Sequence, residues 1–466
     1  MFGQPAVKLT TLVSFNGTNG SSPDGELVLG ADGNFYGTTG YGGTNAPPGN
    51  NGYGTVFRMS LDGTLTSLVS FDGISGWLPQ AGLTQDSQGN LFGSTIVGGT
   101  NNYPYFGVHC GNIFQITTNG TLTSIFSFDD TNGAYPGALS LSSFDGGLYG
   151  TTQTGGTNFY SDGSGMGTAF RVTPDGNLTT LIEFNGNDGA SPLGQLAIGR
   201  QGELYGTTPG GGYGNAFGTA FKLLTNGTLT TLVTFDGTNG AQPTGGLILG
   251  KDGNLYGTTG YGGTNSSQGT YGIGNGSNYV FGFGVVFQLA TDGTLALLVN
   301  FNGTNGGYPR GSLLHGPDGK LYGTTRGGSG SAGNGTIFQV SLDGTFKTLI
   351  MFNGTNGSAP STGVVLGPDG NLYGTTSAGG AFGVGTAFRL TVPMTPVLQP
   401  VLSSIGQFVF SWNSVAGLNY QVQYKADPGS TNWANAGSVI TASSGTTFQT
   451  NAVTGAQGFY RVLLVP

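Results

Sequence analysis

Side chains able to carry out acid–base chemistry are scarce in this sequence. It has 466 residues, of which 21 are acidic and 2 are histidines. Fourteen of the acidic residues stand in Asp-Gly dipeptides, which are typical of tight turns because glycine adopts positive φ at little cost. The other seven are Glu26, Asp86, Asp129, Asp130, Glu183, Glu203 and Asp427. This is a thin supply for an enzyme that needs a pair of carboxylates.

Asp129 and Asp130 are the residues that would suit a metal ion best, because carboxylates are preferred ligands of calcium. The equivalent positions of neighbouring motif copies read Asn-Gly or Asp-Gly, which favours an Asx-type turn instead. We therefore expect no cofactor, and structural calcium is the alternative.

The two histidines are natural candidates for general acid–base work. His315 follows Arg310 by five residues on one predicted strand, a separation of about 16 Å, so the two should approach opposite faces. His109 is followed by Cys110, the single cysteine. Adjacent residues on a strand point apart, so a nucleophilic Cys–His pair is not expected, and Cys110 is interpreted as a buried thiol.

Tyr308, Arg310 and Arg326 stand where related segments carry small or neutral residues. Arginine together with a Tyr or His base is suited to β-elimination in a polysaccharide, because it neutralises a uronate carboxylate while the base removes the adjacent proton. The alternative is sequence drift in a loop. Contact with a ligand is a weaker requirement than catalysis and stays open for all three.

The elements that position these residues form a tandem repeat. A motif Phe-(Asn/Asp)-Gly-x-x-Gly returns at spacings of 51 to 66 residues, with one variant at Phe128, and such a period suits a four-stranded propeller blade. Its copies begin at Phe15, Phe71, Phe128, Phe184, Phe235, Phe301 and Phe352. Seven copies predict an all-β fold, a seven-bladed β-propeller.

The copy around Phe235 illustrates the strands expected in each blade. Residues 245–250 should form the inner strand, and an Asp-Gly turn should lead to a second strand over 254–259. A third strand is expected over 284–288 and an outer strand over 294–301.

Residues 7–15 match only the outer strand of the repeat, whereas the last copy stops after its third strand at 385–390. The N-terminal segment should therefore pair with 385–390 and complete the final blade. This closure would leave no unpaired edge between the first and last blades.

Length variation among the copies is confined to one connection. The separation from the second-strand aromatic residue to the glycine that opens the third strand ranges from 12 to 28 residues, while the other spacings are constant. We call these connections the variable loops, and the rim that carries them the variable face. Variable loops on a rigid scaffold are where binding usually resides.

The variable loops are rich in aromatic residues among Asn, Ser and Gly. Such rings offer flat apolar faces for sugar stacking, or they could pack the loops onto the blades, and both interpretations stay open. They are Tyr41, Tyr53, Tyr103, Tyr105, Tyr160, Tyr213, Tyr261, Tyr271, Tyr279 and Phe281. The ligand-binding candidates are Tyr41, Tyr103, Tyr105, His109, Tyr261, Tyr308, Arg310 and Arg326.

The recurring core Asp252-Gly-Asn-Leu-Tyr-Gly-Thr-Thr259 resembles the GloVer tandem repeat of exported bacterial proteins. The resemblance covers roughly residues 7–392 and implies export and surface association. It transfers no catalytic residue.

The composition changes near Val392, where three prolines mark a linker. Trp412 and Tyr460 lie in segments that resemble a short fibronectin-III-type β-sandwich. We therefore expect two domains, a propeller over 1–392 and a sandwich over 393–466.

Composition and charge exclude several partners. The net charge of −8 with only 13 Lys and Arg argues against nucleic acid, and no apolar run is long enough for a transmembrane segment. The start of the chain lacks signal-peptide features, so a signal peptide is not expected within it.

We expect a secreted or cell-surface protein, a monomer, that binds a glycan or an extracellular protein through the variable face. The alternative is a polysaccharide lyase or glycosidase acting at the axial opening.

Overall fold

The computed structural model describes residues 5–45, 51–100, 110–160, 164–212, 217–264, 272–275, 278–328, 333–399, 403–404, 407–452 and 458–466. Within these ranges the chain is all-β and has no helix. No helix that is long and apolar enough to span a membrane therefore occurs in the described part.

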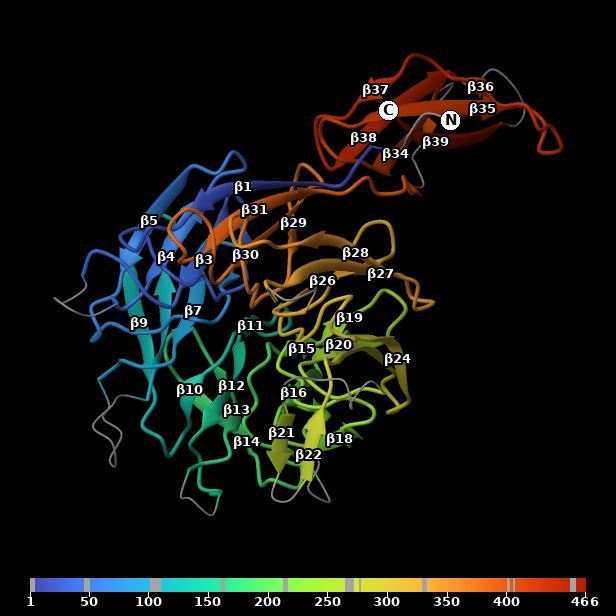
Figure 1. Cartoon of the computed structure of the whole chain (residues 1–466). Helices are drawn as coiled ribbons and strands as arrows, with labels where there is room; N and C mark the ends of the chain where they lie inside the picture. Colours follow the sequence, from blue (N-terminus) through green and yellow to red (C-terminus); the bar gives the residue numbers. More distant parts are fainter. Residues whose placement is uncertain are drawn as a thin grey trace.

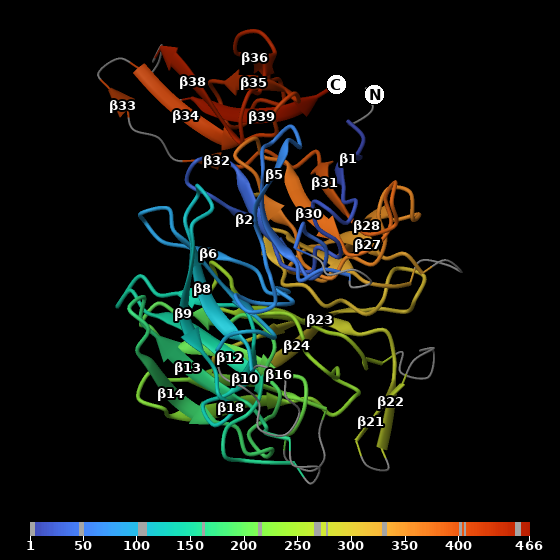
Figure 2. The ribbon, with the colours of Figure 1, turned by 90° about the vertical axis from the view of Figure 1, so that its left-hand side faces the viewer.

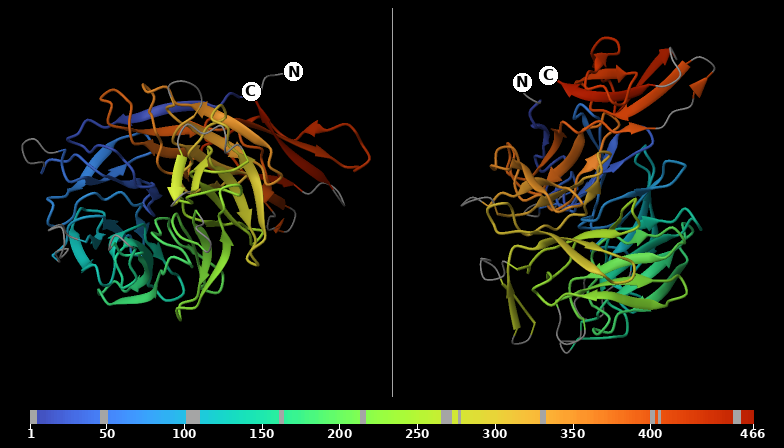
Figure 3. Two further views of the ribbon diagram at one scale, coloured as in Figure 1. Left: turned by 60° about the horizontal axis from the view of Figure 1, so that its bottom comes forward. Right: turned by 90° about the vertical axis from the view of Figure 1, so that its right-hand side faces the viewer.

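Four-stranded antiparallel sheets follow one another along the repeat array and are arranged about a common axis (Figures 1 and 3). The first sheet contains β2 (Val28–Leu29), β3 (Phe35–Thr39), β4 (Thr55–Met59) and β5 (Leu65–Ser70). The second contains β6 (Thr84–Gln85), β7 (Leu91–Thr95), β8 (Asn112–Ile116) and β9 (Leu122–Ser127). The third has five strands, β10 (Ala134–Pro136), β11 (Ser140–Leu141), β12 (Leu148–Thr154), β13 (Thr168–Val172) and β14 (Leu178–Glu183).

The next sheets repeat this order. The fourth contains β15 (Ala197–Ile198), β16 (Leu204–Thr208), β17 (Thr219–Leu223) and β18 (Leu229–Thr234). The fifth contains β19 (Ile248–Leu249), β20 (Leu255–Thr259), β23 (Val285–Leu289) and β24 (Leu295–Asn300), and the hairpin β21 (Gly272–Asn275) and β22 (Asn278–Phe281) lies in its variable loop. The sixth contains β25 (Leu314–His315), β26 (Leu321–Thr325), β27 (Thr336–Val340) and β28 (Phe346–Met351).

The last sheet of the array joins the two ends of the repeat. Its order is β1 (Lys8–Ser14), β31 (Thr386–Thr391), β30 (Leu372–Thr376) and β29 (Val365–Leu366). Lys8 is paired with Thr391 and Ser14 with Thr386, so the predicted pairing of the N-terminal strand with the final third strand is confirmed. The inner strands β2 and β29 also contact each other.

The inner strands are shorter than the sequence predicts. In the copy around Phe235 the strand expected over 245–250 is limited to β19, residues 248–249. Residues 243–246 are not paired with β20 and line the cavity instead. The second, third and outer strands agree with their predicted ranges to within one residue.

Apolar side chains from neighbouring sheets share each core cluster. Phe92 and Ile113 of the second sheet, for example, pack with Leu148 and Phe170 of the third. Every recurring aromatic residue of the second and third strands is at least 97% buried, so these rings form the core between the sheets. Stacking of sheet on sheet therefore holds the array together.

The Asp-Gly turns also anchor tyrosines of the second strand. Tyr256 donates its hydroxyl to the Asp252 carboxylate at 2.7 Å, and Asp252 also accepts the side-chain amide of Asn254. Burial, followed by this contact, raises the pKa of Tyr256 to about 12. Glu203 accepts the Tyr205 hydroxyl at 3.3 Å in a turn where Gln201 replaces the Asp. Asp252 and Glu203 therefore have a structural role, since each holds the hydroxyl of a second-strand tyrosine.

One backbone feature recurs at each junction between consecutive sheets. The residue before a proline has a φ of +50° to +60°, which is rare for residues other than glycine, and it donates its N–H to the carbonyl that precedes the third-strand glycine of the preceding sheet, at 2.8–3.2 Å. The residues are Ser22, Leu78, Tyr135, Ser191, Gln242, Tyr308 and Ala359. Ser22 donates to Val384, so the junction between the ends of the array has the same form.

Two further sheets lie beyond the array, near both termini in Figure 2. One contains β32 (Leu398–Gln399), β33 (Ser403–Ser404), β34 (Gln407–Asn413) and β38 (Thr446–Ala452), and the other contains β35 (Asn419–Lys425), β36 (Ala434–Asn435), β37 (Ile440–Thr441) and β39 (Phe459–Val465). Trp412 and Tyr420 come from different sheets and share one core.

These two sheets contact the turn between β29 and β30. Ala416 donates its N–H to the Asp369 carbonyl at 2.8 Å, and Gly445 donates to Pro368 at 2.7 Å. The variable loops leave the opposite ends of the strands, so these sheets are attached to the rim that faces away from the variable face.

Candidate functional site

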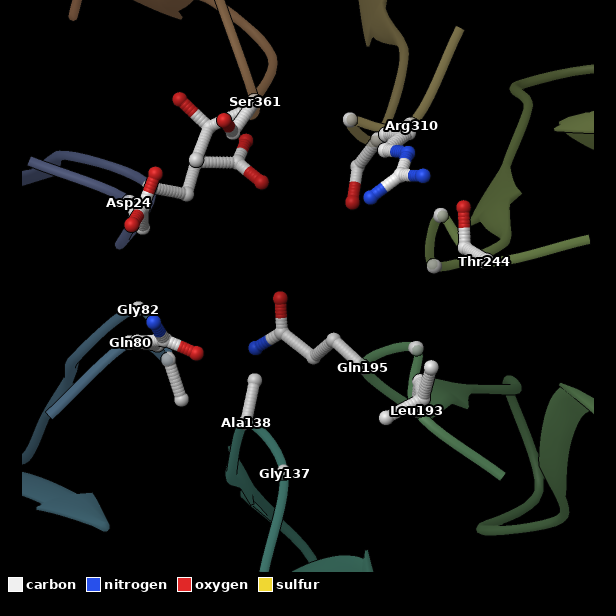
Figure 4. A pocket seen from close by; sticks show the side chains of 18 of the residues that line it. Asp24, Gln80, Gly82, Gly137, Ala138, Leu193, Gln195, Thr244, Arg310 and Ser361 are labelled. Carbon is white, nitrogen blue, oxygen red and sulfur yellow. The ribbon is translucent and has the colours of Figure 1, made fainter. Parts of the chain in front are cut away.

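A cavity of about 230 Å³ lies on the axis of the array (Figure 4). The segments that precede the inner strands line it, and we call them the axial segments. They span 23–26, 79–82, 136–138, 192–195, 243–246, 309–312 and 360–363. They lie beside the variable loops, since a side chain at Gly40 would approach both Gln80 and Asp24. The cavity therefore opens toward the variable face.

Close packing of each axial segment on its neighbour directs side chains toward the axis. A Cβ on Gly25 would lie against the Thr38 hydroxyl and 2.7 Å from the Ala81 carbonyl. Gly25 therefore allows the chain to touch the next segment, while the residues on either side of it, Asp24 and Glu26, both line the cavity.

One side of the cavity is charged. Asp24 and Glu26 come from the first axial segment, Arg310 and Ser312 from the sixth and Ser361 from the seventh, which are consecutive around the axis. Figure 4 shows Asp24 beside Ser361, with the Arg310 guanidinium directed into the open centre.

The other side of the cavity is apolar. Ile96, Tyr135, Pro136, Ala138 and Leu193 line it, and all of them belong to the second, third and fourth repeats. The cavity therefore presents a charged arc opposite an apolar arc.

Neutral hydrogen-bonding groups stand between the two arcs. Gln80 and Thr244 line the cavity there, while Gln195 comes from the apolar side near Ala138 and extends its amide toward the centre in Figure 4. The Thr244 hydroxyl is buried and has no hydrogen-bond partner among the described residues. A buried hydroxyl without a partner is costly, and Thr244 is one of the residues that line the cavity.

The enclosed position of the two carboxylates alters their acidity. Burial raises the pKa of Asp24, while a hydrogen bond from Ser361 and the charges of Arg326 and Arg310 offset part of the rise. Burial raises the pKa of Glu26 to about 7, against a smaller opposing effect of its hydrogen bond with Ser312. Strongly shifted carboxylates in a cavity are typical of functional sites.

The shifted pKa of Glu26 predicts how stability depends on pH. Between the ordinary pKa of 4.5 and about 7, the folded state binds the proton more tightly than the unfolded state, so stability falls as pH rises through this window. We expect Glu26→Gln to raise the melting temperature at pH 8 relative to the unmodified protein, and to do so much less at pH 5.

Glu203→Gln is the matched control in the same thermal unfolding measurement. The pKa of Glu203 is lowered, with burial outweighed by the hydrogen bonds and the charge of Lys222, so its replacement should give no such gain at pH 8. An equal response of both variants at the two pH values would contradict the burial of Glu26.

The sequence-predicted candidates occupy different places. Arg310 lines the cavity, and Arg326 is close enough to Asp24 to lower its pKa. Tyr41, Tyr261 and Tyr308 are not part of the lining and lie in the surrounding loops. Tyr103, Tyr105 and His109 lie outside the described residues.

The aromatic candidates pack against neighbouring residues of the loops. Tyr261 and Tyr308 have ring centroids 5.3 Å apart, and Tyr308 also contacts Phe283 at 5.5 Å. Tyr41 exchanges both backbone hydrogen bonds with Ser21. All three tyrosines are partly buried.

The remaining candidates for acid–base, nucleophilic or metal chemistry lie in environments typical of residues with a structural role. His315 lies on β25 near Tyr256 and does not line the cavity. Cys110 is a buried free thiol whose pKa is raised to about 12, first by burial and then by Asp130 and Asp129. Asp129 accepts the Thr131 hydroxyl and the Asn132 N–H, as in an Asx-type turn. Among the described residues no group of three acidic, His or Cys side chains could hold a metal.

Asp24 and Glu26 are the functional candidates that sequence reasoning misses. Asp24 precedes a glycine and is grouped with the turn residues, yet it is placed at the axis. A signal exists, because the residue after the recurrent proline differs widely among the copies, while the residue that follows it is always Gly, Ala or Thr. These residues are Asp24, Gln80, Gly137, Leu193, Thr244, Arg310 and Ser361.

Comparisons with known proteins give a family. The model of the Gloeobacter/Verrucomicrobia repeat matches residues 3–163, 109–273 and 269–448. No curated protein matches the chain.

Several solved structures are similar at low sequence identity. A fungal alcohol oxidase in complex with copper is 12% identical, covers 100% of this chain and 99% of its own, and has a TM-score of 0.49. A gluconolactonase from Xanthomonas campestris is 14% identical, covers 68% and 86%, and has a TM-score of 0.38. A GH43 protein from Bacillus licheniformis is 12% identical, covers 81% and 82%, and has a TM-score of 0.30.

Proposed function

The chain belongs to the Gloeobacter/Verrucomicrobia repeat family, and from this premise we propose that it is a seven-bladed propeller whose axial cavity binds a sugar residue of a glycan. The seven repeat sheets and the β1–β31 pairing support this architecture. We divide the chain into a propeller over 1–392 and a fibronectin-III-like sandwich over 393–466, which the separate core of Trp412 and Tyr420 supports.

The two-sided lining of the cavity carries this proposal. A sugar ring has apolar C–H faces and a rim of hydroxyl groups, so it needs an apolar surface on one side and hydrogen-bonding groups on the other. Leu193 and Tyr135 supply the first, and Gln80, Gln195 and Thr244 supply the second. Carboxylates such as Asp24 add strong acceptors for hydroxyl groups.

The size of the cavity limits what can enter. Its volume of about 230 Å³ lies below the range of roughly 300–1,000 Å³ that is typical of drug-sized ligands. One monosaccharide unit is therefore the expected occupant, with the rest of the glycan reaching the variable loops. Partly buried tyrosines such as Tyr41 and Tyr261 would contact the glycan there.

This function agrees with a location outside the cell. Glycans are surface molecules, and we propose that the protein is secreted or held at a cell surface, in the manner that the repeat family implies. A monomer suffices, since one chain supplies the whole lining of the cavity. A protein that carries such a glycan is the corresponding macromolecular partner.

Thr244→Val tests the binding proposal with a change of one polar atom. The variant keeps the shape of the side chain and removes the hydroxyl that lacks a partner. We expect it to weaken binding of a responsive glycan from an array by about tenfold, as loss of one hydrogen bond of about 1.4 kcal/mol predicts. Isothermal titration calorimetry measures the change.

Thr230→Val on the exposed face of β18 is the matched control. It should leave affinity unchanged. The proposal fails if no glycan binds, or if Thr244→Val and Thr230→Val bind alike.

Hydrolysis of a glycosidic bond in the same cavity is the second candidate function, and the raised pKa of Glu26 beside Asp24 is the observation that favours it. Glu26 would protonate the leaving oxygen, while Asp24 would accept a proton from the attacking water. Release of reducing sugar by the unmodified protein, lost in Glu26→Gln with binding retained, would establish this function. A lyase would instead give products that absorb in the near ultraviolet, but Tyr308 does not line the cavity as its base.

A further inference from the structure

Positive charge is distributed unevenly over this acidic protein. The sequence has 13 Lys and Arg residues, and all of them lie in described segments. Only Arg310 and Arg326 belong to axial segments or variable loops, and both belong to the same repeat. The other eleven lie on strands, in the turns of the opposite rim or in the C-terminal sheets: Lys8, Arg58, Arg171, Arg200, Lys222, Lys251, Lys320, Lys347, Arg389, Lys425 and Arg461.

Arg310 is available to a ligand. It is exposed, its guanidinium points into the open centre of Figure 4, and the ion pairs of the described residues do not include it. The charge of Arg310 acts to lower the pKa of Asp24, but the two side chains form no ion pair. In a protein with a net charge of −8, an unpaired guanidinium at a cavity is suited to a carboxylate, which it can bind through two parallel hydrogen bonds.

The arrangement of the lining groups around Arg310 indicates which chemical groups the ligand must carry. Ser312 and Ser361 lie on the same side as Arg310, Thr244 comes from the preceding segment, and Leu193 lies on the apolar side. A ligand that fills the cavity thus needs one anionic group on a small ring that also carries hydroxyl groups and an apolar face.

We propose that the sugar bound in the axial cavity is a uronic acid, with its carboxylate on the Arg310 guanidinium and its hydroxyl groups on Thr244 and Gln195. This inference rests on the proposed function and names its ligand class. Arg326 adds a second positive charge at the mouth and favours entry of anionic glycans. Asp24 is held by Ser361 and by the two arginine charges, so it accepts sugar hydroxyl groups on the side away from the ligand carboxylate.

The test compares a uronate-terminated disaccharide with its primary amide, which has nearly the same shape and no charge. The unmodified protein should bind the uronate at least tenfold more tightly than the amide. Arg310→Gln should abolish this preference by weakening uronate binding while leaving the affinity for the amide nearly unchanged. Arg200→Gln, in a turn of the opposite rim, should retain the preference.

The outcomes separate this inference from the proposed function. If the uronate and the amide bind equally, or if the preference survives Arg310→Gln, the carboxylate assignment is wrong while sugar binding stands. A sulfated hexose that binds more tightly than the uronate would also overturn it. If neither disaccharide nor a neutral glycan binds, both proposals fail. Circular dichroism of Arg310→Gln should match the unmodified protein, because the side chain is exposed.

Discussion

Deleting residues 1–15 is expected to lower the melting temperature by about 5 °C and to promote aggregation. The deletion removes β1, which is paired with β31 along its length, together with the fully buried Phe15 and the 9% exposed Val13. At about 1.5–3 kcal/mol for each buried side chain, with smaller terms from the partly buried Leu9 and Leu12, the loss amounts to roughly 5 kcal/mol. With an unfolding entropy of about 2 cal/mol/K per residue, a protein of this size loses about 1 °C for each kcal/mol.

Two controls separate the loss of the β1–β31 pairing from the effect of shortening the chain. Removing only residues 1–6, which precede β1, should leave the melting temperature unchanged. A synthetic peptide with residues 5–17, added to the truncated protein, should restore part of the stability, because the exposed edge of β31 is a template for pairing. If the protein without residues 1–15 melts like the full chain, the account of closure is wrong.

Gly284→Ala is expected to destabilise the fold by about 2–5 kcal/mol, which combines the cost of a non-glycine residue at positive φ with overpacking. Gly284 has a φ of +89°, and a Cβ there would press on the Thr259 carbonyl and lie 2.9 Å from Pro309. The same close approach of a third-strand glycine to the next axial proline recurs at each junction, as at Gly385 and Pro23. Urea unfolding measures the loss.

Gly253→Ala separates the two causes. Gly253 has a φ of +85° and open space around its Cβ position, so the variant carries only the conformational cost of about 1 kcal/mol. Equal losses at Gly284 and Gly253 would show that the junction is not tightly packed. Axial segments would then not be held firmly enough to position Asp24 or Arg310.

The sequence predicts the repeat sheets well because local rules determine them. Strand alternation and Asp-Gly turns such as Asp252-Gly253 specify the second, third and outer strands within one residue. The closing strand is also predictable, since residues 7–15 match one element of the repeat and no other. The inner strands are shorter than expected because glycine and proline in the axial segments end the ladder early.

The candidate site could be predicted only in part. Arg310 stands out in sequence because charge is rare, whereas Asp24 is hidden by its similarity to a turn residue. Cavity geometry depends on how the axial segments converge, and this follows from packing between sheets rather than from any local pattern. The pKa of Glu26 likewise results from burial by segments far apart in the sequence.

A crystal structure with the uronate-terminated disaccharide bound tests the central claim most directly. We expect one sugar ring in the axial cavity, with its carboxylate within hydrogen-bond distance of Arg310, a hydroxyl group on Thr244 and an apolar face toward Leu193. Density for the sugar on the outer strands or on the C-terminal sheets, with an empty axial cavity, would contradict it.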